Sequence, residues 1–401
     1  MNILQYKDNT ENRDAISLFS GAMGLDIGLE KAGLNVAVGQ DFDPSCAATM
    51  RKNGHNVIEG DIRGIQPQQL LDFTRLSPGE PFLICGGPPC QPFSTAGKRL
   101  GINDPRGSLF MDFIRMIDYI RPRFFIMENV KGIMSAPLKH VPLPERDKED
   151  PEQKLGTVLD VILSEFRKLG YKTVYGILDA VNYGVPQFRE RFVLIGSRDN
   201  EDIFLPMPTH FQMHQDGSYR WQTLNDHIKD LEYDCGEYTP FSNNRLEFLK
   251  LVPEGGNWRS LPPELIRQAM GGAYESGGGK VGFYRRLSFN QPSPTLVTSP
   301  VQKATMMCHP TQNRPLSIQE YARIQQFPDK WEFMGTTAAK YRQIGNAVPV
   351  GLAVALGKAI IAVADHNAAI QTKRFRGTNI HSRIKHAIEL GGDCIGKQNI
   401  Q

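Results

Sequence analysis

Seven short apolar segments, separated by stretches with helical spacing, constrain the fold of this chain more than any other feature. The segments are AISLFS, NVAVGQ, VIEGDI, FLICGG, FFIMEN, TVYGIL and RFVLIG, each bounded by Gly, Asp, Asn or Pro. Helical spacing appears between them, for example in residues 108–120 and 158–170. Strands that alternate with helices form βαβ units on a parallel sheet with both faces covered. The sequence therefore predicts an α/β fold with a doubly wound, mostly parallel sheet.

The pattern changes after Arg198. From about residue 201 to 310 the chain carries short strand-like pieces, many Gly and Pro residues and no long helical pattern. Helical spacing returns in SIQEYARIQQF and in VGLAVALGKAIIAVADHN. We therefore expect an α/β domain over residues 1–198, an irregular inserted domain over 199–312, and a return to the first domain over 313–401. The basic end of the chain, with KRFRG and HSRIKH, is either a solvated tail or a segment that touches phosphates.

Composition excludes several other classes of protein. The chain is 40% hydrophobic and 22% charged, which is typical of a soluble globular protein. No stretch reaches the roughly 18 consecutive apolar residues of a membrane span, and the N-terminal segment lacks the apolar core of a signal peptide. Six cysteines without a C-x-x-C pair argue against a zinc site and a disulfide framework. We expect a cytoplasmic protein that binds no metal.

Polar residues follow the first three apolar segments. A Gly-containing turn, FSGAMG, follows the first, Asp41 follows the second and Asp61 follows the third. In an open α/β sheet ligands bind at the carboxyl ends of the strands. A carboxylate there can accept hydrogen bonds from a ribose diol or from the amine of adenine. Each Asp could instead cap a turn, but three such ends in series favour a nucleoside-type cofactor.

A cysteine follows the fourth apolar segment in GGPPCQPFS. The two prolines preset the φ angles of the turn that carries Cys90, which is how a chain would hold a nucleophilic thiol at a ligand-binding edge. Glu128 ends the next segment and would supply a carboxyl beside it. Cys90 could equally be structural, and Glu128 could cap a turn. Arg189 and Arg191 alternate with Gln187 on one face of a strand, where salt-bridged surface arginines are the simpler interpretation.

Taken together, these motifs resemble the DNA (cytosine-5) methyltransferase family of the bacterial restriction-modification type. GGPPCQPFS, ENV, QFRER and IGNAVP occur in the family's order, with the irregular insert before the last. FSGAMGLDIGL resembles the family's first motif, DPRGSLF its fifth and RPLSIQEYARIQQFPD its ninth. The resemblance covers residues 16–363 and implies the class I fold of S-adenosylmethionine-dependent methyltransferases.

The resemblance implies a reaction for these residues. Cys90 would add to C6 of a cytosine flipped out of duplex DNA, so that C5 can accept the methyl group of S-adenosylmethionine. Glu128 would contact N3 and the exocyclic amine of the base, and Arg191 would contact the cytosine. Arg189 would be the partner of Arg191, either structural or directed at a phosphate.

The same resemblance implies two sets of binding residues. The expected S-adenosylmethionine ligands are Phe19, Ser20, Gly21, Gly24, Asp41, Phe42, Asp61, Ile62, Pro88, Leu109 and Asn346. The expected DNA contacts are Gln91, Ser94, Lys98, Arg99, Arg106, Arg285, Arg286 and Thr295. Two positions depart from the family pattern: Met23 replaces a glycine and Asp41 replaces a glutamate. We expect both to weaken cofactor binding slightly.

The insert stands where the family keeps its target-recognition domain. We expect a monomer that reads a short sequence in double-stranded DNA, linked in function but not physically to a cognate restriction endonuclease. Two alternatives stay open: a methyltransferase that acts on cytosine C5 of RNA, and a DNA-binding regulator without catalytic activity.

Overall fold

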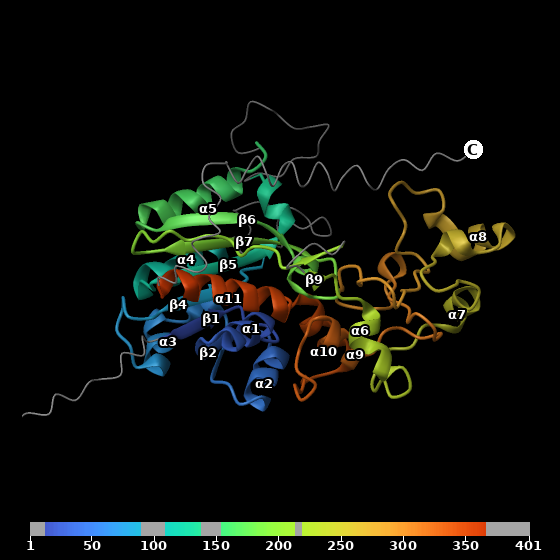
Figure 1. Ribbon diagram of the computed structural model, residues 1–401, viewed down its shortest axis with the longest axis horizontal. Coiled ribbons are helices and arrows are strands. Elements are labelled where there is room, and N and C mark those ends of the chain that lie inside the picture. Colours follow the sequence, from blue (N-terminus) through green and yellow to red (C-terminus); the bar gives the residue numbers. More distant parts are fainter. Residues whose placement is uncertain (1–12, 90–108, 138–153, 213–218, 366–401) are drawn as a thin grey trace, which may run out of the picture. The chain divides into compact units, whose positions relative to one another are not determined.

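A computed structural model describes residues 13–89, 109–137, 154–212 and 219–365 of the 401-residue chain (Figure 1). Its contacts divide the chain into two units, Met1–Ile360 and Ile361–Gln401. The described part of the second unit is confined to residues 361–365. The sheet and the insert both belong to the first unit.

Each of the seven apolar segments forms a strand of one sheet. The strands are β1 (Asp14–Leu18), β2 (Asn35–Asp41), β3 (Val57–Glu59), β4 (Leu83–Gly86), β5 (Phe124–Val130), β6 (Lys172–Asp179) and β7 (Glu190–Ser197). Their order in the sheet is β3-β2-β1-β4-β5-β7-β6, with β1 to β5 parallel to one another. The predicted doubly wound, mostly parallel α/β fold is confirmed.

The direction of β7 was not predicted. β7 runs antiparallel to both of its neighbours, β5 and β6. Only residues 180–189, including the 3-10 helix η6 (Ala180–Tyr183), connect β6 to β7. A parallel crossover needs a dozen or more residues, so this connection permits only a hairpin-like return. As a result the first residues of β7 lie at the carboxyl edge of the parallel strands.

Helices cover both faces of the sheet. The α-helices are α1 (Gly24–Ala32), α2 (Pro44–Lys52), α3 (Pro67–Thr74), α4 (Leu109–Ile120), α5 (Thr157–Lys168), α6 (Leu224–Ile228), α7 (Asn243–Leu249), α8 (Pro263–Met270), α9 (Ile318–Ile324), α10 (Thr337–Asn346) and α11 (Val350–Ala364). On one face, α3, α4 and α5 pack on alternate residues of the strands. Members of this core include Ile16, Leu18, Ile84, Phe125, Met127, Phe192 and Leu194 from strands, and Leu70, Phe113, Ile117, Ile162 and Phe166 from helices.

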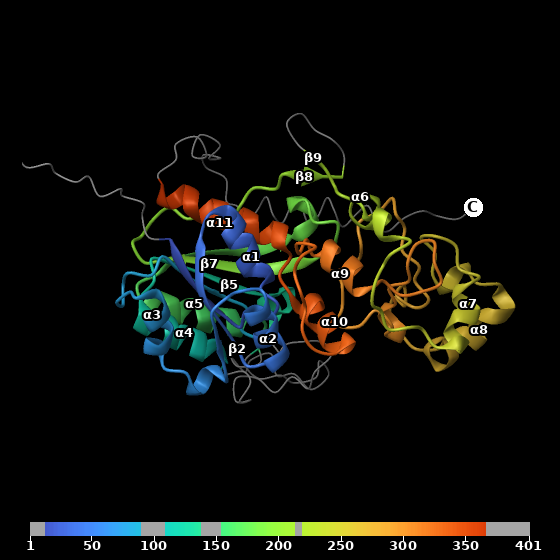
Figure 2. The same ribbon diagram turned by 90° about the horizontal axis from the view of Figure 1, so that it is seen from below.

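On the other side α1 and α11 lie against each other, as Figures 1 and 2 show. A Cβ atom built on Gly28 of α1 would lie 2.3 Å from the Cβ of Ala353 and 2.5 Å from the carbonyl oxygen of Val350. Only glycine permits this approach of the two helix backbones. The contact ties the start of α11, near the end of the chain, to the first helix.

We predict that Gly28→Ala lowers the free energy of unfolding by about 2 kcal/mol, because the added methyl group overpacks the contact between α1 and α11. Urea denaturation would measure the loss. Gly272→Ala is the matched control, since a Cβ there meets no atom within 4 Å. Equal stability changes in the two variants would contradict the prediction.

The insert has a hydrophobic core of its own. Its helices α6, α7 and α8 have five, seven and eight residues, and β8 (His210–Phe211) pairs with β9 (Tyr219–Arg220). Short 3-10 helices complete it: η7 (Lys229–Leu231), η8 (Trp258–Ser260), η9 (Gly271–Ala273) and η10 (Lys303–Thr305). The core residues are Phe241, Phe248, Leu249, Val252, Leu261, Ala269, Met270, Tyr284, Met306 and Cys308. The domain boundaries at 198/199 and 312/313 stay a prediction.

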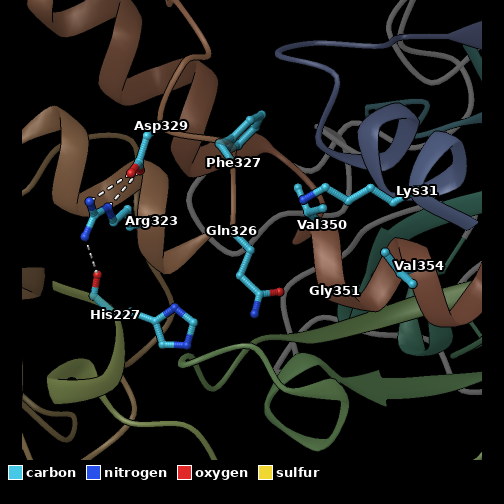
Figure 3. A pocket seen from close by; sticks show the side chains of 9 residues that line it. All are labelled: Lys31, His227, Arg323, Gln326, Phe327, Asp329, Val350, Gly351 and Val354. Carbon is cyan, nitrogen blue, oxygen red and sulfur yellow. Dashed lines mark hydrogen bonds and ion pairs between the residues drawn. The ribbon is translucent and has the colours of Figure 1, made fainter.

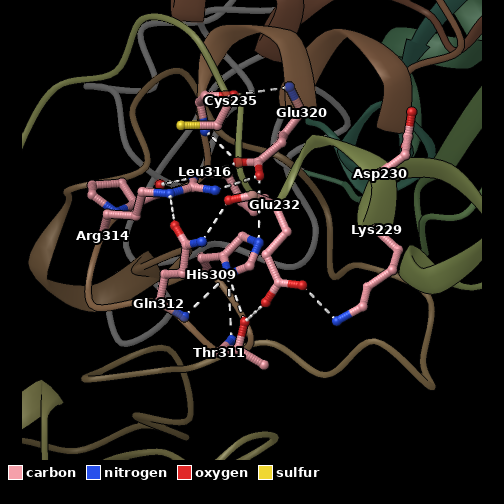
Figure 4. A network of polar contacts seen from close by, with 12 residues as sticks. Lys229, Asp230, Glu232, Cys235, His309, Thr311, Gln312, Arg314, Leu316 and Glu320 are labelled. Carbon is pink, nitrogen blue, oxygen red and sulfur yellow. Dashed lines mark hydrogen bonds and ion pairs between the residues drawn. The ribbon is translucent and has the colours of Figure 1, made fainter.

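A buried polar network joins the end of the insert to α9 (Figure 4). Glu320 of α9 accepts two hydrogen bonds from the guanidinium of Arg314, each 2.7 Å long. Both side chains are almost completely buried. The same carboxylate accepts from the backbone N–H of Ser317 and so caps α9. A paired and hydrogen-bonded ion pair of this kind can be buried, whereas either charge alone could not.

His309 extends this network as a neutral side chain. Its Nδ1 accepts hydrogen bonds from the backbone N–H groups of Thr311 and Gln312, at 3.3 and 3.2 Å. The ring hydrogen is therefore on Nε2, which lies 3.4 Å from Glu320 Oε1. Burial and the nearby Arg314 lower the pKa of His309 to about 3. The network thus holds the ion pairs Arg314–Glu320 and Lys229–Glu232, and the histidine adds no further charge.

Among the described residues, the stretch 337–364, which contains α10 and α11, is long and apolar enough to cross a membrane by length and composition alone. Its mean hydropathy reaches 2.1, and 67% of that window is buried within the protein. Burial of this extent is typical of a core helix.

Candidate active site

The predicted site residues that follow the strands lie at one edge of the sheet. β1, β2, β3, β4 and β5 all end there, because they are parallel. The loop Phe19–Gly21 follows β1, Asp41 ends β2, Asp61 follows β3 and Pro88 follows β4. Figure 1 shows β2, β1, β4 and β5 of this sheet. The expected ligand-binding edge is thus the common edge at which the parallel strands end.

Glu128 of β5 and Arg191 of β7 form a salt bridge at that edge. In the antiparallel register Glu128 lies opposite Val193 and Val130 lies opposite Arg191. Residues two apart on a strand share a face, so Glu128 and Arg191 are diagonal neighbours. Arg191 Nε lies 2.7 Å from Glu128 Oε1, and both side chains are nearly buried. Arg191 lies at this edge because β7 is antiparallel to β5, so that β7 begins where β5 ends.

Burial dominates the acid-base properties of this pair. It raises the pKa of Glu128 above its usual value, against the opposing effects of Arg191 and Arg189. It also lowers the pKa of Arg191, against the attraction of Glu128. A carboxyl group whose pKa is raised keeps its proton to higher pH, so Glu128 can serve as a proton donor or holder. Its salt bridge fixes the position from which it would do so.

Arg189 is completely buried and pairs with backbone rather than with an acid. Its Nη1 donates to the carbonyl oxygen of Leu296 at 3.0 Å and its Nη2 to that of Gly345 at 2.7 Å. Its backbone N–H donates to Asp179 Oδ1 at 2.8 Å. Burial, with some repulsion from Arg191, lowers the pKa of Arg189 well below its ordinary value. The sequence suggested a salt-bridged surface face as the simpler interpretation, but this arginine joins three distant segments in the interior.

Asn129, a residue to which the sequence reasoning gave no role, holds the turn after β4. Its Nδ2 donates to the carbonyl oxygen of Pro88 at 2.9 Å, and Asn129 is buried. On the next residue back, a Cβ at Gly87 would lie 3.0 Å from Glu128 Oε2. The ENV motif therefore has two uses: Glu128 faces Arg191 while Asn129 fixes the proline turn. Its position beside Glu128 was the signal that could have identified it.

Several expected site residues lie outside the described residues. They are Cys90, Gln91, Ser94, Lys98, Arg99 and Arg106.

Asp41 holds the loop after β1 through hydrogen bonds. Asp41 Oδ2 accepts from the backbone N–H of Gly21 at 2.8 Å, and Oδ1 accepts from that of Asp43 at 2.9 Å. Burial raises the pKa of Asp41. Each carboxylate oxygen can accept a second hydrogen bond, so the group fixes its own loop and still has acceptor capacity for a ligand. A Cβ at Gly21, which has a φ of 56°, would meet no atom within 4 Å, which leaves open space above the loop.

The neighbouring residues of the loop are held in the same way. Phe19 has a φ of 55° and its N–H donates to the side chain of Gln40 at 3.2 Å. Ser20 Oγ donates to Ser17 Oγ at 2.8 Å. A Cβ at Gly24 would lie 2.3 Å from the carbonyl oxygen of Val348, so α1 starts in close contact with the segment after α10.

The backbone conformation at Met23 is one that favours glycine. It precedes α1 with a left-handed φ of 67° and a completely buried side chain. A non-glycine residue in this conformation costs roughly 1–2 kcal/mol. The expected effect of Met23 on cofactor affinity stays a prediction.

The other expected cofactor residues differ in exposure. Phe42 is 69% exposed, and Asn346, the last residue of α10, is also exposed. Asp61 is exposed and pairs with Arg63, which lowers its pKa to about 2. Ile62 is buried, and Leu109 packs on the core beside it.

The three described residues expected at DNA divide into two kinds. Thr295 is exposed, and its hydroxyl donates to the carbonyl oxygen of Phe188 at 2.7 Å. Arg285 is partly buried and donates from Nε to the carbonyl oxygen of Met306 at 3.0 Å. Arg286 differs from the expectation. It is buried, and its guanidinium donates to Leu249, Val252, His309, Gln312 and Asn313.

The guanidinium of Arg286 therefore stabilises the fold of the insert. It satisfies loop carbonyls that would otherwise be buried without partners. The sequence showed two adjacent arginines, and nothing local distinguishes the one that turns inward.

A cavity of about 340 Å³ lies between α9 and α11 (Figure 3). Its lining contains none of the expected site residues and consists of Lys31, His227, Arg323, Gln326, Phe327, Asp329, Val350, Gly351 and Val354. Arg323 is paired there with Asp329 and with Asp230.

The model of the C-5 cytosine-specific DNA methylase family matches residues 14–362 of the chain. The chain belongs to this family. It is a DNA cytosine-5 methyltransferase, as the motifs predicted.

Curated relatives of this DNA cytosine-5 methyltransferase come from several bacteria. The Type II methyltransferase M.PspPI of Psychrobacter sp. is 42% identical over 86% of this chain and 78% of its own length. M.Sau96I of Staphylococcus aureus is 41% identical over 88% of this chain and 76% of its own length. M.Eco47II of Escherichia coli is 39% identical over 87% and 79%.

Solved structures share the fold at lower identity. A prophage-encoded E. coli protein described as a DNA modification methyltransferase superposes with a TM-score of 0.61 and 22% identity, over 88% of this chain and 99% of that chain. Spodoptera frugiperda DNMT2 gives a TM-score of 0.54 and 19% identity, over 87% and 99%.

For this methyltransferase we predict a pH-dependent loss of stability in Arg191→Met. Without its partner the buried Glu128 carboxylate costs about 3 kcal/mol when charged. Its folded-state pKa, already raised, rises further, so stability is fully present only below the unfolded-state pKa and is lost as pH rises through the folded-state pKa. Thermal denaturation at about pH 8 and about pH 5 would measure the difference, with the larger loss at the higher pH. The double variant Glu128→Gln with Arg191→Met should lack this pH dependence, and an equal loss at both pH values in the single variant would contradict the assignment.

Proposed function

We propose that this chain is the modification enzyme of a Type II restriction-modification system, which transfers a methyl group from S-adenosylmethionine to C5 of a flipped cytosine within a short sequence of duplex DNA. The single observation that carries the proposal is the buried Glu128–Arg191 pair at the carboxyl edge of the sheet, next to the turn that leads to Cys90. Similarity to the Type II methyltransferases supports the biological role.

The catalytic roles follow from the chemistry of cytosine. The thiolate of Cys90 adds to C6, and the electron pair of the C5–C6 double bond moves to C5, which becomes nucleophilic. Glu128 holds a proton at N3 and so stabilises the electron density that the attack pushes into the ring. C5 would then bond to the methyl carbon that bound S-adenosylmethionine supplies, as the bond from that carbon to sulfur breaks and leaves its electron pair on the sulfur. Loss of the C5 proton then returns an electron pair to the ring and expels the thiolate. Arg191 keeps the Glu128 carboxyl in place throughout.

The residues at the edge fit S-adenosylmethionine, which supplies an electrophilic methyl group when bound. Asp41 has acceptor capacity for ribose hydroxyls and already fixes the Gly21 loop. The space above Gly21 is open, and Phe42 presents an exposed ring that can cover an adenine. We assign cofactor binding to the loop Phe19–Gly21, Asp41 and Phe42, with Asp61 and Asn346 at its margins.

Target recognition is assigned to the insert. A base in duplex DNA cannot reach a thiol at the sheet edge unless it leaves the helix, so the reaction requires base flipping. Arg285 and Thr295 remain candidates for DNA contact, together with Gln91, Ser94, Lys98, Arg99 and Arg106 from the sequence. We expect a monomer in the bacterial cytoplasm that needs no metal and no physical contact with an endonuclease.

The test is methyl transfer from labelled S-adenosylmethionine to mixed-sequence duplex DNA, followed by bisulfite sequencing. We predict C5-methylcytosine confined to one short motif and a loss of at least about a thousandfold in Cys90→Ser, because the hydroxyl is a far weaker nucleophile than the thiolate. Cys235→Ser is the matched control, since Cys235 is a partly exposed cysteine of the insert.

Each other result has a definite meaning. Transfer to RNA but not to duplex DNA would replace the DNA substrate with the RNA alternative. Full activity of Cys90→Ser would overturn the covalent mechanism. No transfer to either nucleic acid, with the cofactor bound, would contradict the enzymatic function.

A second prediction concerns the cofactor. Phe42→Ala should raise the Kd for S-adenosylmethionine about tenfold, because stacking on a base contributes roughly 1–3 kcal/mol. Isothermal titration calorimetry would measure the change. The Tm should not move, since the ring of Phe42 is 69% exposed. Phe73→Ala, which removes a 45% exposed ring on α3, is the control, and equal affinities in the two variants would contradict the assignment.

A further inference from the structure

A closed ring of hydrogen bonds surrounds the side chain of Arg189. Gln325, the residue after α9, accepts from Gln187 Nε2 at 3.1 Å. Gln187 Oε1 accepts from the backbone N–H of Leu296 at 2.9 Å. The carbonyl oxygen of Leu296 accepts from Arg189 Nη1 at 3.0 Å, and Arg189 Nη2 donates to Gly345 at 2.7 Å.

The side-chain amide of Gln325 closes the ring. Its Nε2 donates to the carbonyl oxygen of Ile344 at 2.7 Å and to that of Ala347 at 3.2 Å. Ile344 is covalently joined to Gly345, the acceptor of Arg189. Because the amide oxygen accepts and the amide nitrogen donates, the orientation of the Gln325 side chain is fixed by its partners.

Every side chain of the ring is buried. Gln187 and Gln325 have no exposed surface, and Arg189 is 1% exposed. Polar groups in such surroundings are costly when a partner is lost, so the ring should behave as one unit.

The ring joins four segments that are far apart in the sequence. The two glutamine side chains are 138 residues apart, and Arg189 and Gly345 are 156 residues apart. Leu296 belongs to the end of the insert, and a Cβ at Gly345 would lie 2.5 Å from the carbonyl oxygen of Val297. Asn346, an expected cofactor residue, follows Gly345. The ring therefore lies between the insert, residues 187–189 before β7 and the end of α10.

The position of Arg189 depends on this ring. Its guanidinium is held by the carbonyl groups of Leu296 and Gly345, and its Nε has no hydrogen-bond partner among the described residues. Leu296 is held in turn on its other side by Gln187 and hence by Gln325. Arg189 is repelled by Arg191 and attracted by Glu128. If the carbonyl groups moved, the guanidinium would be drawn toward Glu128, in competition with Arg191.

We propose that Gln325 is a positioning residue of the methyltransferase reaction. It acts through Gln187 and Leu296 to hold Arg189 away from the Glu128–Arg191 pair. The same contacts hold the end of the insert against residues 187–189. This inference rests on the proposed function, because it requires that Glu128 and Arg191 contact the target cytosine.

The test is steady-state kinetics of Gln325→Met on duplex DNA with labelled S-adenosylmethionine. Methionine has a similar volume and removes all three side-chain hydrogen bonds. We expect kcat to fall about tenfold to a hundredfold, as for other small displacements of a catalytic group, with the KM for the cofactor changed by less than about twofold. Gln187→Met should give a similar loss. The double variant should be no slower than either single variant, because the ring is already open.

Gln343→Met separates positioning from general destabilisation. Gln343 is a buried glutamine of α10 that accepts from Thr49 at 2.7 Å and donates to Met334 at 2.8 Å, outside the ring. It should lower the Tm comparably and leave kcat within about twofold of the wild type. An equal fall of kcat in Gln325→Met and Gln343→Met, or additive losses in the double variant, would overturn the inference.

Failure of the inference can be distinguished from failure of the proposed function. An active wild type whose Gln325→Met variant keeps full kcat overturns only the positioning role. A wild type that transfers no methyl group to DNA overturns the proposed function and the inference with it.

Discussion

The antiparallel return of β7 is the constraint on which the site depends. It places the beginning of β7 at the edge where the five parallel strands end, and the register then sets Arg191 diagonal to Glu128 on one face. If β7 ran parallel, Arg191 would lie at the opposite edge. Neither charge could be buried alone, since an unpaired buried carboxylate or guanidinium costs several kcal/mol. The pair and the strand direction therefore require each other.

The remaining site groups are held by the protein before any ligand arrives. Asp41 fixes the Gly21 loop with the same carboxylate that we assign to the ribose. Asn129 fixes the proline turn from the residue beside Glu128. Such supports matter because groups held within a fraction of an ångström of the reactive geometry need no reorganisation during the reaction. Among the contacts that hold the insert are that of His309 with Glu320 and that of Leu296 with Arg189.

Much of this arrangement could be predicted from the sequence. All seven apolar segments form strands, and the predicted α/β fold, the family and the enzymatic class are confirmed. The alternation in QFRER correctly placed Arg189 and Gln187 on one side of the chain, since both are buried and Phe188 is exposed. The surroundings of that side could not be predicted, because they come from Leu296 and Gly345. The same holds for Arg286, whose acceptors lie in loops on either side of it in the sequence.

The sequence by itself determined the strands, the turns and the residue types of the site. These follow from local stereochemistry: the period of side chains along a strand, the fixed φ of proline and the motifs that carry them. Only the tertiary structure decided the direction of β7, the burial of Arg189 and Arg286, and the partners of Gln325. The physical reason is that the hydrogen-bond partners of these buried polar groups come from other segments of the chain, 34 residues away for Arg286 and Val252 and 138 residues away for Gln187 and Gln325. No local pattern encodes such a meeting, because it is decided by the packing of the whole domain.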